Sequence, residues 1–528
     1  MITTLLLTAA LAFPLEDNVR ALAAIAGEPN RIGAAGITRD EMPILTIENG
    51  AAFDPAATKR RLVLIGGLDG DARSVDAVVA AVRWFKTRAS SATRREWTIS
   101  ALPSAHFDPA DTLSLTRWIT FQAPDLVVTT GGVWDALKGV PCRSIGVGDG
   151  LPPSREASAN RRSLGGGGQA VPDGAIAALR KILSTPISRS PLHDELIARV
   201  LREPLAIAKV LARRYPEAPS ISYIPAIAWT QTLRLAALTN DDSLRERVRQ
   251  QIQPWMSGEK KLFGDRIQLT SVAGTMIFAE LAAAGDTAAL RLADEAVPLA
   301  AARKPTGIAE YGQGWTDDMF MATSVLARAS LRPNHQAELD NAARLLIDYA
   351  ARVQQPNGLF NHASDAPAAW GRGNGFAAFG LMETLTVMPA QHGSRSTLLE
   401  IFRRQMMAAK AQQSPDGMWR QIIDEPGAYR EETATAMLMT AMARGIRFGW
   451  LDRSYLPAVH RAWRALAAHV AGDGTLVDVC ASTGGGTTKR YYFDRPAITG
   501  ADDRGGAMAL LAAMDMYELA KSGQSTRQ

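Results

Sequence analysis

The residues whose side chains could best take part in catalysis begin in a segment at 311–321. Its sequence is YGQGWTDDMFM, so a glycine-flanked Trp315 leads into two adjacent carboxylates, Asp317 and Asp318, at the start of an apolar helical pattern. A positioned carboxyl group can donate and accept protons in catalysis. Two acids in the first turn are also what a helix favours without any catalytic role, because they complement its positive end.

A second polar segment lies at 361–376. It contains His362 and then a glycine-rich run with Trp370, Arg372, Asn374 and Phe376. An arginine can bind a carboxylate through two parallel hydrogen bonds. Acids, a cation, hydrogen-bonding groups and flat aromatic faces together indicate a site for an anionic sugar. A plainer interpretation of each motif is a turn with a satisfied histidine, or a packing corner around a buried indole.

Helical spacing fills the chain from about residue 190. Apolar residues recur at i, i+3, i+4 and i+7 and predict helices over 192–214, 222–238, 243–253, 268–284, 287–303, 316–331, 336–354, 371–387, 394–412, 430–446, 454–470 and 504–521. Twelve helices joined by unequal loops predict an all-α toroid of six hairpins. Gly-, Trp- and Asp-rich loops precede alternate helices, so the N-termini of the inner helices would ring one mouth. Helix N-termini attract anions.

The first 185 residues alternate strand and helix patterns. Residues 61–67 form an apolar run that ends in glycines, as a buried parallel strand does, and 97–102 and 125–130 read as further strands. Helical spacing covers 75–85. We therefore expect an α/β domain over 13–185, followed by the all-α barrel over 190–525. Four glycines at 165–168 indicate a flexible loop or domain edge.

Length, charge and cysteine content limit the classes of function. A chain of 528 residues is too long for one ordinary core. Its 58 basic and 53 acidic residues include no Lys/Arg run, so we expect no nucleic-acid partner. Cys142 and Cys480 are too far apart in sequence to form a CxxC metal motif.

The N-terminal residues 1–12 are nearly all apolar and end in an A-x-A pattern. They resemble a signal peptide, although the usual basic residues before the apolar run are missing. We expect a periplasmic or secreted protein, with a cytoplasmic one as the alternative. No other stretch is long and apolar enough to span a membrane.

The barrel region, about residues 195–522, resembles glycoside hydrolase family 105 and its relative family 88. These are unsaturated uronyl hydrolases built on an (α/α)6 barrel. The similar segments occur in the family's order: 315–321 for W-x-D-x-L/M-F/Y-M, 358–362 for G-L-x-x-H, 370–375 for W-A-R-G-N-G, 417–419 for G-x-W, 431–437 for E-x-x-x-T-A-M, and 480–496 for the terminal segment. Phe376 stands where the family usually has Trp.

The resemblance implies that Asp317 is the general acid and base and that a second acid falls on Asp265. The residues that it implies at the substrate are Trp315, Asp318, His362, Trp370, Arg372, Asn374, Phe376 and Trp419. The implied reaction hydrates the double bond of a 4,5-unsaturated uronic acid at the non-reducing end of an oligosaccharide and releases the rest of the chain. It requires no cofactor and no metal.

The N-terminal region is faintly similar to a zinc carboxypeptidase or deacylase domain. Where that family has G-x-H-G-x-E, this chain has Gly67-Leu68-Asp69-Gly70-Asp71-Ala72, and a later ligand histidine would fall near Gly131. A catalytic zinc needs about three protein ligands, and Ala72 cannot be one. We therefore expect a degenerate domain without metal.

Other functions remain open at this stage. A saturated β-glucuronidase or another (α/α)6 sugar enzyme would need a second carboxylate opposite Asp317, for which Asp265 and Glu431 are the candidates. A non-catalytic carbohydrate-binding protein would fit the change at Phe376. An amidase acting through the N-terminal domain would require zinc.

Overall fold

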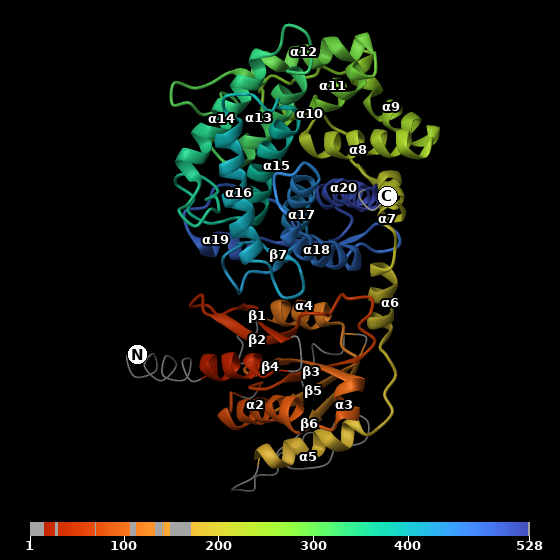
Figure 1. Cartoon of the computed structure of the whole chain (residues 1–528), viewed down its shortest axis with the longest axis vertical. Helices are drawn as coiled ribbons and strands as arrows, with labels where there is room; N and C mark the ends of the chain where they lie inside the picture. The colour runs from red at the N-terminus through yellow and green to blue at the C-terminus, as the bar shows by residue number, and fades with distance from the viewer. Residues whose placement is uncertain are drawn as a thin grey trace. The chain divides into compact units, whose positions relative to one another are not determined.

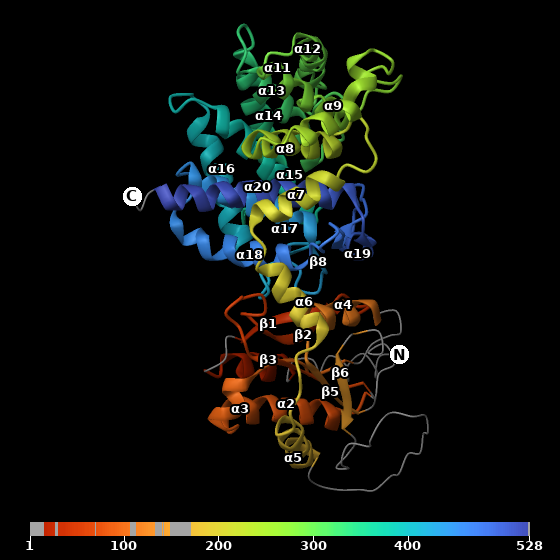
Figure 2. The same cartoon turned by 90° about the vertical axis from the view of Figure 1, so that its right-hand side faces the viewer.

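A computed structural model of the chain describes residues 15–26, 30–68, 70–105, 112–131, 140, 142–147 and 171–525. The chain forms two compact units, residues 1–200 with 425–429, and residues 201–424 with 430–528 (Figures 1 and 2). The expected signal peptide at 1–12 and the glycines at 165–168 lie outside the described residues. Among the helices that the structure describes, none combines the length and apolar character that crossing a membrane requires.

The first unit is built on a six-stranded sheet with the order β1-β2-β4-β3-β5-β6. Its strands are β1 (Asn30–Ile37), β2 (Pro43–Asn49), β3 (Arg60–Ile65), β4 (Trp97–Leu102), β5 (Leu126–Thr130) and β6 (Arg143–Val147). Strands β3 to β6 pair in parallel, whereas β1 and β2 are antiparallel. The strands predicted at 61–67, 97–102 and 125–130 are thus confirmed. The sequence patterns did not reveal the antiparallel β1 and β2.

Helices cover both faces of this sheet. Leu62 and Leu64 of β3 pack with α2 (Ala72–Thr87) and α5 (Val171–Leu183) on one face. Val63 and Ile65 pack with α4 (Thr112–Gln122) on the other face. Side chains alternate along a strand, so an unbroken apolar run needs two covered faces. The short α3 (Ser91–Glu96) leads into β4.

The structure corrects one predicted helix near the expected domain boundary. The pattern at 192–214 is two helices, α6 (Pro191–Val200) and α7 (Pro204–Arg214), because Pro204 lacks an N–H and begins the second one. Helix α6 groups with the first unit, not the second. The buried Asp125 carboxylate accepts hydrogen bonds from His193 Nδ1 at 2.9 Å and from Ser190 N at 2.6 Å, which holds α6 there.

The second unit is a closed ring of helical hairpins. Its inner helices pack each against the next: α8 (Tyr223–Thr239), the short pair α10 (Leu269–Gly274) and α11 (Met276–Ala283), α13 (Thr316–Ala329), α15 (Gly371–Val387), α17 (Glu432–Arg447) and α20 (Asp503–Ser525), which returns to α8. The outer helices are α9 (Asp242–Met256), α12 (Thr287–Ala301), α14 (Ala337–Val353), α16 (Arg395–Ala411), α18 (Leu456–Ala468) and α7. This is the six-hairpin ring that the helical patterns predict.

The inner helices are apolar nearly all round, whereas an outer helix such as α14 buries one face. Helices α13 and α15 approach closely, since a Cβ at Gly380 would lie 2.2 Å from Met319 O. The pattern at 268–284 is interrupted at Thr275, between α10 and α11.

Short elements occupy the loops between the helices. They are β7 (Trp419–Arg420), β8 (Arg430–Glu431), a 3-10 helix (Arg453–Tyr455), β9 (Leu476–Cys480), α19 (Lys489–Phe493) and β10 (Ala497–Gly500). β7 pairs with β8 just before α17, and β9 pairs with β10 just before α20. The sequence patterns missed these strands because they are short and have no clear alternation.

Candidate active site

Asp318 closes the loop that leads into α13. Its carboxylate accepts hydrogen bonds from Gly314 N and Tyr349 Oη, both at 2.7 Å, and its side chain is buried. A Cβ at Gly312 would lie 2.4 Å from this carboxylate, so the loop needs glycine there. Burial raises the pKa of Asp318 to about 6, because the hydrogen bonds offset only part of the cost of burying a charge. Asp318 therefore holds the loop, and its expected contact with the substrate stays a prediction.

Asp317 and His362 meet at the N-terminal end of α13. Asp317 Oδ2 lies 3.2 Å from His362 Nε2, and the Asp317 side chain is 16% exposed. On the other side of the buried imidazole, Nδ1 lies 2.8 Å from Tyr492 Oη, and this oxygen accepts a hydrogen bond from Gly486 N. We assign the Tyr492 hydroxyl proton to the bond with Nδ1. His362 then carries its own proton on Nε2 and donates it to Asp317.

Aromatic rings surround His362, and one of them lies under the Arg372 guanidinium. The ring centres of Trp315 and Trp370 lie 5.1 and 4.5 Å from that of His362, and Trp370 is buried. The Arg372 guanidinium lies 5.0 Å from the Trp370 ring and donates from Nη1 to Cys480 O at 2.8 Å. Its Nε is buried and has no hydrogen-bond partner in the described structure. Burial lowers the pKa of Arg372, but the acidic groups around it raise that pKa by more, so the side chain stays a cation.

Backbone contacts fix the two polar segments against each other. Thr316 N donates to His362 O, and His362 N donates to Ala368 O, both at 2.9 Å. A Cβ at Gly373 would lie 2.6 Å from Thr316 Oγ1, so the first turn of α15 needs a glycine beside α13. The glycine-rich sequence is therefore what lets Arg372 reach the neighbourhood of Asp317.

Asn374 and Trp419, both expected at the substrate, are committed to the protein itself. Asn374 accepts from Phe360 N and donates to Phe360 O, each at 2.8 Å. Trp419 is fully buried and donates from Nε1 to Ala409 O of α16 at 2.6 Å. Both side chains are buried and take part in packing, and their expected contact with a sugar stays a prediction.

Phe376 is also part of the packing between inner helices. Its buried ring lies 5.4 Å from that of Tyr223 and 6.1 Å from that of Phe320, which places it among α8, α13 and α15. Asp265 lies in the loop between α9 and α10 and is exposed. The described contacts do not bring Asp265 to Asp317, so they give no support to the expected pair of acids.

The alternative second acid, Glu431, is a helix cap. Its carboxylate accepts from Ala434 N at 2.6 Å in the first turn of α17 and from Cys480 N at 2.9 Å. The next residue, Glu432, is buried, and neither of its oxygens has a hydrogen-bond partner in the described structure. Burial and then the charges of Glu431 and Asp502 raise the pKa of Glu432 well above its ordinary value. Sequence reasoning missed Glu432, since a first-turn glutamate looks like an ordinary exposed acid.

Tyr492 is the other residue that sequence reasoning left out of the site. It lies in the terminal segment of the family pattern, but nothing local connects it to His362, which is far away in the chain. The site offers acid and base chemistry through Asp317 and an anion-binding cation in Arg372. In the part of the chain that the structure describes, no group of three His, Cys, Asp or Glu side chains could hold a metal. Asp69, the N-terminal metal-ligand candidate, lies outside the described residues, and Asp71 caps α2.

Comparison with known proteins places this site in a family context. The pattern of Glycosyl Hydrolase Family 88 matches residues 207–520. The unsaturated 3S-rhamnoglycuronyl hydrolase of Formosa agariphila is 30% identical over 181 residues, which are 31% of this chain and 48% of that protein. The unsaturated rhamnogalacturonyl hydrolase YesR of Bacillus subtilis is 26% identical over 179 residues, which are 32% of this chain and 50% of that protein. The chain thus spans about half the length of these curated relatives.

Solved structures share the fold of the helical ring. A possible member of glycoside hydrolase family 105 from Salmonella enterica has a TM-score of 0.53 at 19% identity, covering 63% of this chain and 99% of that one. A family 105 glycoside hydrolase from C. acetobutylicum also has a TM-score of 0.53 at 19% identity, covering 60% of this chain and 98% of that one. At such identities the likeness concerns the architecture alone.

Proposed function

The chain belongs to Glycosyl Hydrolase Family 88, and on this basis we propose that it removes a 4,5-unsaturated uronic acid from the non-reducing end of an acidic oligosaccharide. The observation that carries the proposal is the hydrogen-bonded series Asp317, His362 and Tyr492, with the Arg372 cation beside it. The names of the two curated relatives, a rhamnoglycuronyl and a rhamnogalacturonyl hydrolase, support this class of substrate.

In this reaction Asp317 handles the proton. Its carboxyl group gives a proton to C4 of the substrate's double bond, and a water molecule forms the new bond at C5. The carboxylate takes back one proton from that water. The hemiketal formed at C5 then opens and releases the rest of the oligosaccharide. One carboxyl group serves both steps, so the absence of contact between Asp317 and Asp265 is compatible with the chemistry.

The neighbours of Asp317 divide the remaining tasks. His362 donates a hydrogen bond that orients the Asp317 carboxylate after the proton has left. The free Nε of Arg372 faces no partner of its own in the described structure, and a substrate carboxylate would supply one. Trp315 is partly exposed beside the buried His362, so its indole is the aromatic face that a sugar ring would contact.

The test is the loss of the double bond's ultraviolet absorbance in a panel of lyase-generated oligosaccharides. We expect the wild type to remove the absorbance and Asp317→Asn to lose this activity. Asp265→Asn is the matched control, because it makes the same change on an exposed acid. Equal loss in the two variants would instead favour a two-carboxylate enzyme. No loss of absorbance with any substrate, while sugar still binds, would favour a carbohydrate-binding protein.

A further inference from the structure

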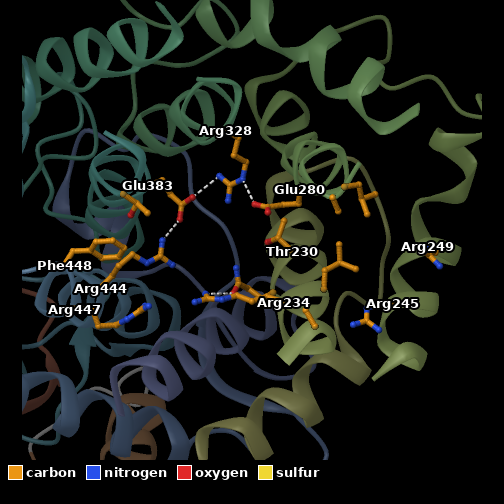
Figure 3. Close-up of a pocket in the computed structure, with 16 residues that line it drawn as sticks. Thr230, Arg234, Arg245, Arg249, Glu280, Arg328, Glu383, Arg444, Arg447 and Phe448 are labelled. Atoms are coloured by element: carbon orange, nitrogen blue, oxygen red, sulfur yellow. Dashed lines mark hydrogen bonds and ion pairs between the residues drawn. The ribbon is translucent and has the colours of Figure 1, made fainter. Parts of the chain in front are cut away.

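A large cavity lies at the opposite end of the ring from Asp317. It has a volume of about 680 Å³ and is lined mainly by the C-terminal halves of the inner helices α8, α11, α13, α15 and α17 (Figure 3). Arg372 begins α15 and Glu383, in the cavity wall, lies near its end, which corresponds to a separation of ~16 Å along the helix. The cavity is therefore distinct from the candidate active site, and its volume suits a small-molecule ligand.

Part of the charge in this cavity is a structural network. Arg328 bonds Glu280 at 2.8 Å and Glu383 at 2.9 Å, while Arg444 bonds Glu383 at 2.7 Å and Asp515 at 2.8 Å. Cations are favoured here, because the C-terminal ends of helices carry partial negative charge. Burial raises the pKa values of Glu383 and Asp515, but the arginines lower them by more, so both acids stay ionised. The charges of Arg328 and Arg444 are therefore balanced within the protein and require no ligand.

Two further arginines of the wall are left outside this network. Arg245 and Arg249 are one turn apart on α9, and Figure 3 shows them across the cavity from Arg444 and Phe448. The acid partner of Arg245 is Asp242, which is 89% exposed, and such pairs contribute little. Arg249 has no ion pair in the described structure. Like charges at i and i+4 destabilise a helix, so an anion between them would relieve an existing cost.

The other walls supply what a sugar needs besides its charge. Phe448 is 48% exposed and lines the cavity. The ring stacks on Trp450 at 5.2 Å between ring centres, and its exposed part can pack against a pyranose ring. Thr230 and Gln231 add a hydroxyl and an amide on α8. We propose that this cavity is a second, non-catalytic binding site for an acidic saccharide, with its anionic group at Arg245 and Arg249 and a ring on Phe448. This inference rests on the proposed function only for the choice of an acidic sugar as the ligand.

The test is calorimetric titration of the full-length protein with saturated digalacturonate, which lacks the double bond that the proposed reaction consumes. We expect a binding component that Arg245→Ala/Arg249→Ala weakens by about tenfold or more, since a hydrogen bond to a charged group is lost at each position. The matched control is Arg213→Ala/Arg291→Ala, which removes two cations that are 67% and 65% exposed elsewhere on the ring. Identical titrations of the two double variants would overturn the proposal.

A third variant separates a saccharide from a simple anion. Phe448→Ala should weaken digalacturonate binding and leave the binding of inorganic sulfate unchanged. If sulfate bound as tightly as digalacturonate and Phe448→Ala changed neither, the saccharide assignment would be overturned. Turnover of unsaturated oligosaccharides is measured in parallel on the same proteins. Absence of turnover in all of them would refute the proposed function. The calorimetric comparison would still show whether the cavity binds an acidic saccharide.

Discussion

Replacing Tyr492 by Phe would remove one hydroxyl group from the candidate active site and leave its ring in place. The lost hydroxyl lies 2.8 Å from His362 Nδ1, and the ring centres of the two residues are 5.7 Å apart. A buried polar atom that loses its partner costs about 1–3 kcal/mol. Nothing then holds the proton of His362 on Nε2, where it can bond Asp317. If this cost falls on the transition state, kcat decreases by about 5- to 150-fold.

The assay is the decrease in ultraviolet absorbance of an unsaturated oligosaccharide, followed over a range of substrate concentrations and pH. Tyr491→Phe is the matched control, because the neighbouring hydroxyl of α19 accepts a hydrogen bond from Gly484 N at 3.0 Å and does not bond His362. We expect Tyr492→Phe to lower kcat at nearly constant KM and to change the pH profile. The reasoning is refuted if both variants lose the same activity, or if Tyr492→Phe changes KM alone.

Three further substitutions test single contacts. Because burial raises the pKa of Asp318 to about 6 from 3.8, the folded protein keeps a proton that the unfolded chain releases, and stability declines as the pH rises from about 4 to 6. Asp318→Asn should remove up to about 3 kcal/mol of that pH dependence. Thermal melts of the wild type and the variant at pH 4 and 7 measure it. The same change in Tm between the two pH values in both proteins would contradict this prediction. Trp419→Phe loses the hydrogen bond to Ala409 O and should lower the free energy of unfolding by about 1–3 kcal/mol at unchanged KM. A raised KM at unchanged Tm would instead show that Trp419 contacts the substrate. Arg372→Lys should raise KM, because an ammonium group cannot keep the hydrogen bond to Cys480 O and also offer two coplanar donors to a carboxylate. An unchanged KM would show that Arg372 does not bind the substrate carboxylate.

Helical periodicity in the sequence was enough to predict the architecture of the second unit. The spacing of apolar residues reports which side of a helix is buried, and that spacing is a property of a few consecutive residues. Pro204 interrupts one such pattern, and a single proline is a local signal that the prediction of one helix over 192–214 overlooked. Acids and glycines at the start of α13 and α15 are equally local features, so the sequence indicated both segments. The choice of Asp317 as the acid rested on the resemblance to glycoside hydrolase family 105.

The role of each side chain within those segments depended on the closure of the ring. Asp317 and Asp318 are adjacent in sequence, yet one lies beside His362 and the other is buried against Tyr349, because successive residues of a helix point in different directions. The burial of Trp419 likewise depends on its neighbours in space.

The chain by itself therefore determined which helices form and which segments carry polar chemistry. Only the tertiary structure decided that Tyr492 supports His362, that Glu432 has no hydrogen-bond partner in the described structure, and that arginines from separate helices line one cavity. The physical reason is the range of the interactions. Helix formation and capping act over a few residues, whereas these contacts join segments that meet only when the last inner helix packs against the first.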